Sequence, residues 1–262
     1  MKAQDIVDRI GSGVAKALAT KSLFLGLEGG TYDNPELKPE YVTTVKVGEA
    51  LIDASHVVRL EASMRRLRDA TLAHARMKLI NKKDELAKLE AAFQPFNFGK
   101  KRLDVLVLSP NGFEPPILMA EAKLGVGNIA GVLRDIERVV TLFQMLDLAG
   151  LRSDTTYGAI VFHFMHEDTV DDSGGIVRAT TAGANLLLDG VANQLAFLAQ
   201  ARPWLNAKAG LLTTAGHSTT TSGHLEVYDD GSVNGEFEKH GYTFVPGLIL
   251  LGSAPDVKTV RF

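Results

Sequence analysis

The chain has 262 residues, of which 45% are hydrophobic and 23% charged, and its formal net charge at neutral pH is −3. This composition excludes a disordered or collagen-like protein, and no stretch approaches the ~18 uncharged apolar residues of a membrane span. The absence of cysteine excludes disulfide scaffolds, thiolate metal sites and thiol nucleophiles. Asp5 and Asp8 occur where a signal peptide needs an apolar run, so we expect a cytoplasmic protein.

The net charge conceals a strong asymmetry along the chain. Residues 59–102 contain twelve basic and five acidic side chains, which gives this segment a charge of +7. The remaining 16 basic and 26 acidic residues give the rest of the chain a charge of −10. The basic segment therefore predicts either a solvated helix face or a surface that binds phosphate groups.

The first part of the sequence is typical of helices. Apolar residues at helical spacing predict a helix over residues 3–20, and clustered glycine and proline predict an irregular connection over 26–39. Residues 41–52 favour a second helix, although the β-branched residues at 41–47 also fit a strand. An apolar stripe with roughly heptad spacing from Leu60 to Phe93 predicts one long basic helix over 59–98, a candidate coiled-coil arm.

The remainder alternates between strands and helices. Two short apolar runs, 103–108 and 117–123, predict two strands joined by a turn at 109–112. An amphipathic helix over 128–148, a buried strand over 157–164 and a helix over 181–201 follow, and the tail predicts strands at 225–228, 233–238 and 242–251. We expect an α/β fold organised as a single domain.

Both apolar runs contain charged residues where burial should exclude them. Asp104 lies within the first run, and Glu121 and Lys123 end the second. A buried charge costs several kcal/mol unless it is paired or bound to a metal. If the two runs form a hairpin with Leu108 opposite Ile117, Asp104 lies opposite Glu121, and Lys123 shares the face of Glu121. A slip of one residue would move Asp104 to the other face.

In this register the two carboxylates form an oxygen-lined pocket. Directly opposed Cβ atoms in an antiparallel pair are about 5 Å apart. Oxygen ligands at that separation suit a hard divalent cation such as Mg²⁺. The sequence therefore predicts a metal site at the hairpin, with the ammonium group of Lys123 beside it.

These residues resemble a known signature. The run Arg102-Leu103-Asp104-Val105-Leu106-Val107, followed by Ile117-Leu118-Met119-Ala120-Glu121-Ala122-Lys123, resembles the Asp…Glu-x-Lys motif of the PD-(D/E)xK (restriction-endonuclease-like) nuclease superfamily, with leucine in place of the nominal proline. The resemblance covers about residues 41–164 and implies a core ordered helix–three strands–helix–strand. Residues 57–61 are the only candidate for the first strand. The expected architecture is this core at 41–165, with a mixed central sheet flanked by helices, a long helical insertion at 59–98 and a helical and β-rich C-terminal part at 166–262.

The resemblance also implies a function. It implies a metal-dependent endonuclease that uses Mg²⁺ or Mn²⁺ and acts on DNA rather than RNA, with a role in restriction or phage defence. Asp104, Glu121 and Lys123 would be catalytic, and Glu49 would complete the metal ligands, with Glu61 as its rival. A homodimer formed along the long helix would supply two sites for double-strand cleavage. Phosphate contacts are expected from exposed basic residues: Arg65, Arg66, Lys82, Lys83, Lys101, Arg102 and Arg134.

Three other interpretations compete with this one. The first is a non-catalytic module that keeps the nuclease-like fold for interaction or nucleic-acid binding. The second is a dinucleotide site at the glycine-rich run 125–131, which lies between a strand and a helix. The third is a transition-metal site at His163 and His166, although both also suit the end of a strand and a solvated loop.

Overall fold

The described strands form one mixed sheet. The computed structural model describes residues 1–26, 39–53, 55–110, 114–126, 129–168, 182–202, 204–212, 218–224 and 238–253. Its strands run in the order β1-β2-β3-β4-β7-β5, and β6 also pairs with β7. All neighbouring strands are antiparallel except β3 and β4. The strands are β1 (Val57–Ser63), β2 (Arg102–Leu108), β3 (Leu118–Val126), β4 (Tyr157–Asp168), β5 (Asn206–Leu211), β6 (Ser218–His224) and β7 (Glu238–Gly252).

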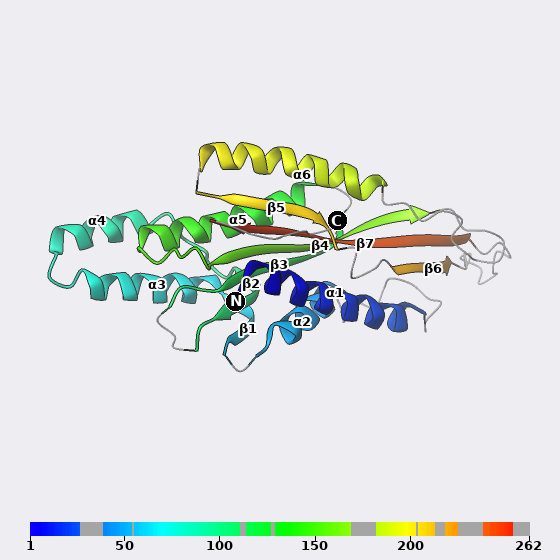
Figure 1. The fold of residues 1–262 in the computed structure, drawn as a ribbon, viewed down its shortest axis with the longest axis horizontal. Coiled ribbons are helices and arrows are strands. Elements are labelled where there is room, and N and C mark those ends of the chain that lie inside the picture. The colour runs from blue at the N-terminus through cyan, green and yellow to red at the C-terminus, as the bar shows by residue number, and fades with distance from the viewer. Residues whose placement is uncertain are drawn as a thin grey trace, which may run out of the picture.

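Helices cover both faces of this sheet. The helices α1 (Ala3–Gly26) and α2 (Pro39–Leu51) lie on one face, and α5 (Ile129–Leu148) and α6 (Ala182–Ala201) lie on the other (Figure 1). A hairpin of α3 (Met64–Lys78) and α4 (Lys83–Phe93) projects from one end of the molecule. No helix in the described ranges is long and apolar enough to cross a membrane.

The two faces of the sheet have separate apolar cores. Ile6, Ile10 and Val14 of α1 are fully buried at a spacing of four residues, and they belong to a cluster that includes Val105 and Ala120. Met119 and Leu106 point the other way and join the cluster of α5, because side chains alternate along a strand. The alternation within β2 and β3 thus decides which side chains face α5.

Most of the predicted elements are confirmed. The helices expected at 3–20, 41–52, 128–148 and 181–201 are α1, α2, α5 and α6, and the strands expected at 103–108, 117–123, 157–164 and 242–251 are β2, β3, β4 and β7. Residues 57–61, the candidate for the first core strand, lie in β1. Residues 27–38 of the connection expected at 26–39, the strand expected at 225–228 and residues 233–237 of the strand expected at 233–238 lie outside the described residues. The strands β5 and β6 were not predicted.

The long helix predicted over 59–98 is wrong. This segment contains β1, then α3, then a turn, then α4. Ser63 ends the strand and caps α3, since its hydroxyl oxygen accepts a hydrogen bond from the Arg66 N–H at 3.3 Å. Part of the apolar stripe is buried in the protein's own core, because Leu72, Ala75 and Phe93 belong to the core beneath α5. The described residues 59–98 therefore do not form the single long helix on which the expected coiled-coil arm was based.

Gly13 allows α1 and α2 to come unusually close. A Cβ atom at this position would lie 2.7 Å from both the Lys46 carbonyl oxygen and the Val47 Cα atom, which are backbone atoms that cannot swing away. We expect Gly13→Ala to lower the free energy of unfolding by about 1–3 kcal/mol despite the ~1 kcal/mol gain in helix propensity. Urea denaturation measures the change. Ser12→Ala, at the exposed neighbouring position, is the control and should not destabilise; equal stability of both variants would contradict the close approach.

Candidate functional site

The pairing of β2 with β3 brings the predicted acidic residues together. The two strands pair antiparallel with Val105 opposite Ala120, Leu106 opposite Met119 and Val107 opposite Leu118. This is the register that the sequence predicted, and its continuation places Asp104 opposite Glu121. The Asp104 Oδ2 atom accepts a hydrogen bond from the Ala122 N–H at 2.6 Å. The side chain of Asp104 is therefore anchored to the strand that carries Glu121.

Two buried acidic side chains meet two cations where β3 packs against α5. Arg138 of α5 donates to the Glu121 Oε1 atom at 2.8 Å, and its other terminal nitrogen lies 3.4 Å from the Asp135 Oδ1 atom. The ammonium nitrogen of Lys123 lies 3.7 Å from the Asp135 Oδ2 atom. The side chains of Glu121 and Asp135 are each 4% exposed, whereas Lys123 and Arg138 are about one third exposed. The cations thus cover the acids on their solvent side.

Burial changes the proton affinity of these acids. The pKa of Glu121 is raised to about 8, first because burial disfavours the charged carboxylate and second because Asp104 is negatively charged, while Arg138 acts in the opposite direction. The pKa of Asp135 is also raised, chiefly by burial, against the attraction of Lys123 and Arg138. Asp104, Glu121 and Asp135 therefore interact as one group of neighbouring carboxylates.

Lys123 lies against the first turn of α5, beside Gly131. A Cβ atom at Gly131 would lie 3.4 Å from the Lys123 Cε atom. This glycine belongs to the run that the sequence also suggested as a dinucleotide loop. In the structure it lies in the first turn of α5, where an added Cβ atom would make an ordinary van der Waals contact with the lysine side chain.

The carboxylate oxygens at this site are of the type that binds a hard divalent cation. Asp104 and Glu121 supply carboxylate oxygens, and the buried Asp135 Oδ2 atom has no hydrogen-bond partner among the described residues. Mg²⁺ is commonly held by one or two carboxylates and keeps several waters. Within the described ranges, no group of three or more histidine, aspartate or glutamate side chains is arranged to hold a metal by itself. A cation at this site would accordingly need water or substrate oxygens to complete its coordination.

The structure does not bring Glu49 to the other acidic residues. Glu49 lies on α2, whose Val47 and Leu51 belong to the opposite core, and its carboxylate pairs with Lys46 at 2.9 Å and is 51% exposed. Its rival Glu61 lies in β1 between Leu60, opposite Val105, and Ala62, opposite Leu103. The register therefore places Glu61 across from Asp104, on the next strand. Its φ of 49° is in the left-handed region, which is unusual for a non-glycine residue.

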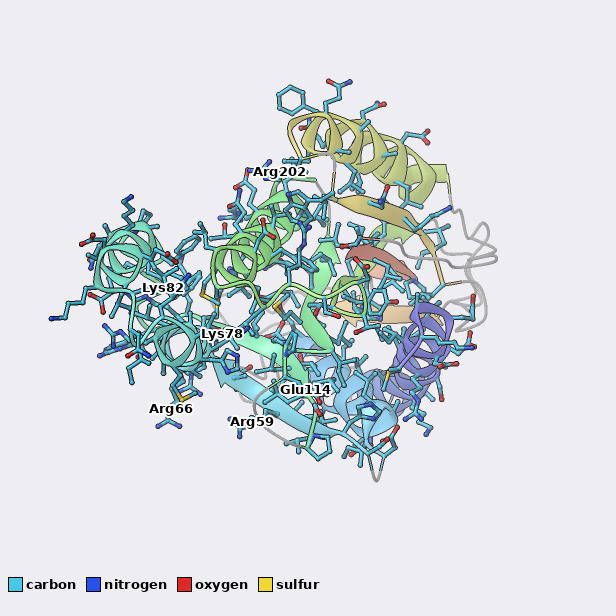
Figure 2. The ribbon with its side chains drawn as sticks, turned by 60° about the vertical axis from the view of Figure 1, so that its left-hand side comes forward. Arg59, Arg66, Lys78, Lys82, Glu114 and Arg202 are labelled. Carbon is cyan, nitrogen blue, oxygen red and sulfur yellow. The ribbon has the colours of Figure 1, made fainter. Side chains whose placement is uncertain are left out.

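The expected phosphate-binding residues are exposed, but they do not form one cluster. Arg65, Arg66 and Arg102 line a groove between β1 and α3, while Lys82 and Lys83 lie at the start of α4. Figure 2 shows Arg59 and Arg66 projecting from β1 and α3 at the same edge of the molecule. Arg134 is exposed on α5, and Lys101 is exposed just before β2. Only the three groove residues are therefore gathered at one surface.

Sequence reasoning missed Asp135 and Arg138. Both lie in the amphipathic helix predicted at 128–148. Asp135 occupies the buried stripe, three residues after Val132 and four before Val139, so a charge within that stripe was the signal. Its partner Lys123 is contributed by a different element, and no local pattern could reveal that contact.

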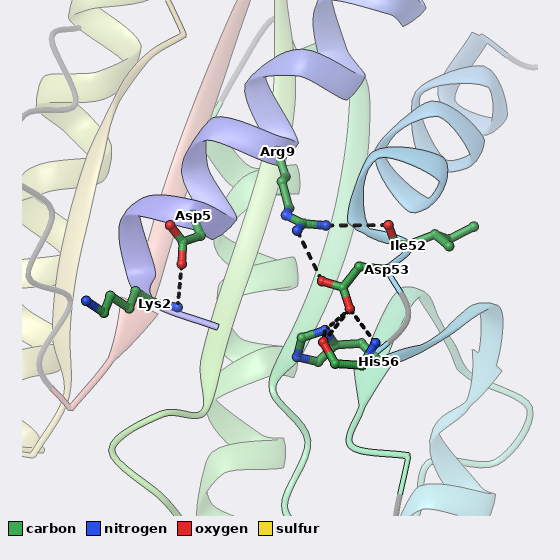
Figure 3. A network of polar contacts seen from close by, with 7 residues as sticks. Lys2, Asp5, Arg9, Ile52, Asp53 and His56 are labelled. Atoms are coloured by element: carbon green, nitrogen blue, oxygen red, sulfur yellow. Dashed lines mark hydrogen bonds and ion pairs between the residues drawn. The ribbon is translucent and has the colours of Figure 1, made fainter.

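A second polar cluster connects α1 to the start of β1. Asp53 pairs with Arg9 at 3.1 Å and accepts hydrogen bonds from Ser55, which lower the pKa of Asp53 well below its usual value (Figure 3). Asp53, Ser55 and His56 match a catalytic triad in residue type. However, the His56 Nδ1 atom faces both Ser55 Oγ at 3.1 Å and Asp53 Oδ1 at 2.6 Å, whereas a triad uses the two ring nitrogens separately. The cluster stabilises the connection between α2 and β1.

Comparison with known proteins identifies no relative. No protein-family model matches the chain, and no significant match was found among curated proteins or solved structures.

Glu121 makes the stability of the metal-free protein depend on pH. Its pKa is about 8 when folded and 4.5 in the reference state, so the unfolded chain loses its proton first. The free energy of unfolding should therefore fall by a few kcal/mol as pH rises from about 4.5 to about 8. Urea denaturation in the presence of EDTA measures this profile.

The variant Glu121→Gln should make the profile shallower, because it removes the group whose pKa is raised to about 8 and leaves the contribution of Asp135. The matched control is Glu137→Gln, an exposed acid on α5, which should retain the wild-type slope. A wild-type slope in Glu121→Gln would show that Glu121 is ionised throughout this range.

Proposed function

We propose that the protein is a Mg²⁺- or Mn²⁺-dependent nuclease of the restriction-endonuclease-like class. The observation that carries this proposal is the β2–β3 register, which sets Asp104 across from Glu121 with Lys123 on the same face. The acids lie in adjacent strands and interact strongly enough for Asp104 to raise the pKa of Glu121. A divalent cation would neutralise the repulsion between two such carboxylates. A divalent cation can also assist the hydrolysis of a phosphodiester.

The arrangement of elements supports the same class. The chain order α2, β1, β2, β3, α5, β4 agrees with the helix–three strands–helix–strand core that the resemblance implies, and α3 and α4 are inserted between the first two strands. The sheet places these strands side by side as β1-β2-β3-β4, with α2 and α5 on opposite faces. We assign residues 39–168 to this core on that basis.

Each residue has a separate task in this proposal. Asp104 and Glu121 would hold the cation, which when bound neutralises charge on the phosphate and lowers the pKa of a water. Lys123 would donate hydrogen bonds to the phosphate oxygens on which negative charge develops. Asp135 would orient Lys123, and Arg138 would balance the buried acids in the absence of a cation.

Cleavage assays test the proposal. Asp104→Ala and Lys123→Ala should each lower Mg²⁺- or Mn²⁺-dependent cleavage of DNA by about 100-fold or more, because each removes a group that acts on the transition state. Plasmid and single-stranded substrates are incubated with purified protein and the products separated on gels. Glu137→Ala, an exposed carboxylate on α5, is the control and should cleave like the wild type. Equal rates for the wild type and both site variants would contradict a nuclease function.

A second candidate is a non-catalytic module with the same fold. Arg138 favours it, because its guanidinium already satisfies the Glu121 carboxylate without any cation. Isothermal titration with Mn²⁺ separates the two candidates. A nuclease should bind Mn²⁺ and lose that binding in Asp104→Ala, whereas in the non-catalytic module Arg138 is a permanent counter-ion and neither protein should bind the metal.

A further inference from the structure

A groove runs between the edge strand β1 and the helix α3. Its volume is about 1320 Å³. Residues 59–63 form one wall, and the side of α3 from Arg65 to Met77 forms the other. Its floor is formed by Leu106 and Leu108 of β2 together with Leu146 and Leu151. Leu106 and Leu146 are almost fully buried, whereas Leu108 and Leu151 are partly exposed, so the accessible part of this leucine floor is apolar.

The rim of this groove carries uncompensated positive charge. Five basic residues line it, against the acidic Glu61, Asp69 and Glu114. Asp69 is already paired with Arg65 at 3.9 Å and Arg68 at 2.8 Å. In the part of the chain that the structure describes, no ion pair involves the other four basic residues that line the groove: Arg59, Arg66, Lys100 and Arg102. The rim therefore suits a polyanion.

The interior of the groove also presents a histidine side chain. His74 lines the groove, and its buried Nδ1 atom has no hydrogen-bond partner among the described residues. Bases can stack on imidazole or guanidinium planes and present donors and acceptors at their edges. Phosphates on the rim and bases in the interior would use both the basic and the apolar groups that line the groove.

The apolar floor and His74 distinguish a single strand from a duplex. The bases of a duplex are paired and stacked, so they cannot lie against His74 and the leucine floor, whereas an unpaired strand can turn its bases inward. At a rise of about 1.5 Å per residue, the stretch of α3 from Arg65 to Met77 is roughly 18 Å long, which is enough for a short single strand.

The groove also reaches the proposed active site. Glu61 lines it, and the β1–β2 register places Glu61 across from Asp104. Leu106, on its floor, projects from the same face of β2 as Asp104, because the two are separated by two residues. A strand lying along the groove would thus run toward the Asp104–Glu121 pair.

We propose that this groove binds single-stranded nucleic acid, with phosphates on Arg59 and Arg66 and bases against His74 and the leucine floor. The inference rests on the proposed function only in naming the strand as the substrate. Binding itself needs neither a metal nor a cleavage step.

Fluorescence anisotropy tests the assignment, with a labelled DNA single strand of roughly 12 nucleotides and a duplex of the same sequence, both in EDTA. The wild type should bind the single strand about tenfold or more tightly than the duplex. An abasic strand of equal length should bind about tenfold or more weakly than the normal strand, since each lost base contact is worth about 1–3 kcal/mol. Equal or tighter binding of the duplex, or equal binding of the abasic strand, would overturn the proposal.

Charge reversal locates the binding surface. The double variant Arg59→Glu/Arg66→Glu changes two exposed groove residues and should raise the single-strand Kd about tenfold or more. The matched control Lys78→Glu/Lys88→Glu makes the same charge change on α3 and α4, at exposed residues outside the groove lining, and should raise it far less. Equal effects of the two double variants would overturn the assignment to the groove. Displacement of the bound strand by poly-glutamate of equal charge would also overturn the assignment. A change of oligomeric state in the groove variant alone would overturn it as well.

The failure of this inference can be told apart from the failure of the proposed nuclease function. If the wild type prefers single strands but cleaves no substrate, the groove assignment is supported and the nuclease function is contradicted. If the wild type cleaves DNA in an Asp104-dependent manner but binds the duplex at least as tightly as the single strand, the nuclease function is supported and the groove assignment is contradicted.

Discussion

The antiparallel register of β2 and β3 is the constraint on which the candidate site depends. Shifting this pairing by one residue would send Asp104 to the face covered by α1 and α2, away from Glu121. Apolar residues on both faces hold the register, because Leu106 and Met119 belong to one core and Val105 and Ala120 to the other. A slip would bury Asp104 among apolar side chains, so the cores enforce the arrangement of the acids.

The helix α5 then balances the charge that this register creates. Glu121 and Asp135 are buried, and their negative charge is costly unless cations lie close to them. Arg138 contacts both acids, and Lys123 contacts Asp135. Breaking one of these contacts leaves a buried charge without its partner. The same contacts explain why two functions compete, because a guanidinium that stabilises the metal-free protein also occupies an oxygen that a cation would use.

Local sequence patterns were sufficient to predict a helix or strand where the apolar spacing fits only one of the two. The helix at 128–148 and the strands at 103–108 and 157–164 were predicted within a few residues. The segment 59–98 was misread because Leu60 continues the apolar stripe of α3 by spacing alone. Ser63 ends the strand there, and the contact of β1 with β2 overrides the helical pattern. Tertiary pairing decides such cases, since a short apolar run suits either element.

The sequence by itself placed Asp104, Glu121 and Lys123 in two neighbouring apolar runs, and it offered one register in which they share a face. The tertiary pairing of β2 with β3 selected that register. The sequence also predicted the concentration of positive charge at 59–102. Only the tertiary structure decided that Asp135 and Arg138 complete this group, that Glu49 lies on the other side of the sheet, and that part of the basic segment lines a groove beside Glu61. These outcomes depend on how helices pack on the sheet. Contacts between residues from separate elements leave no trace in the spacing along either one.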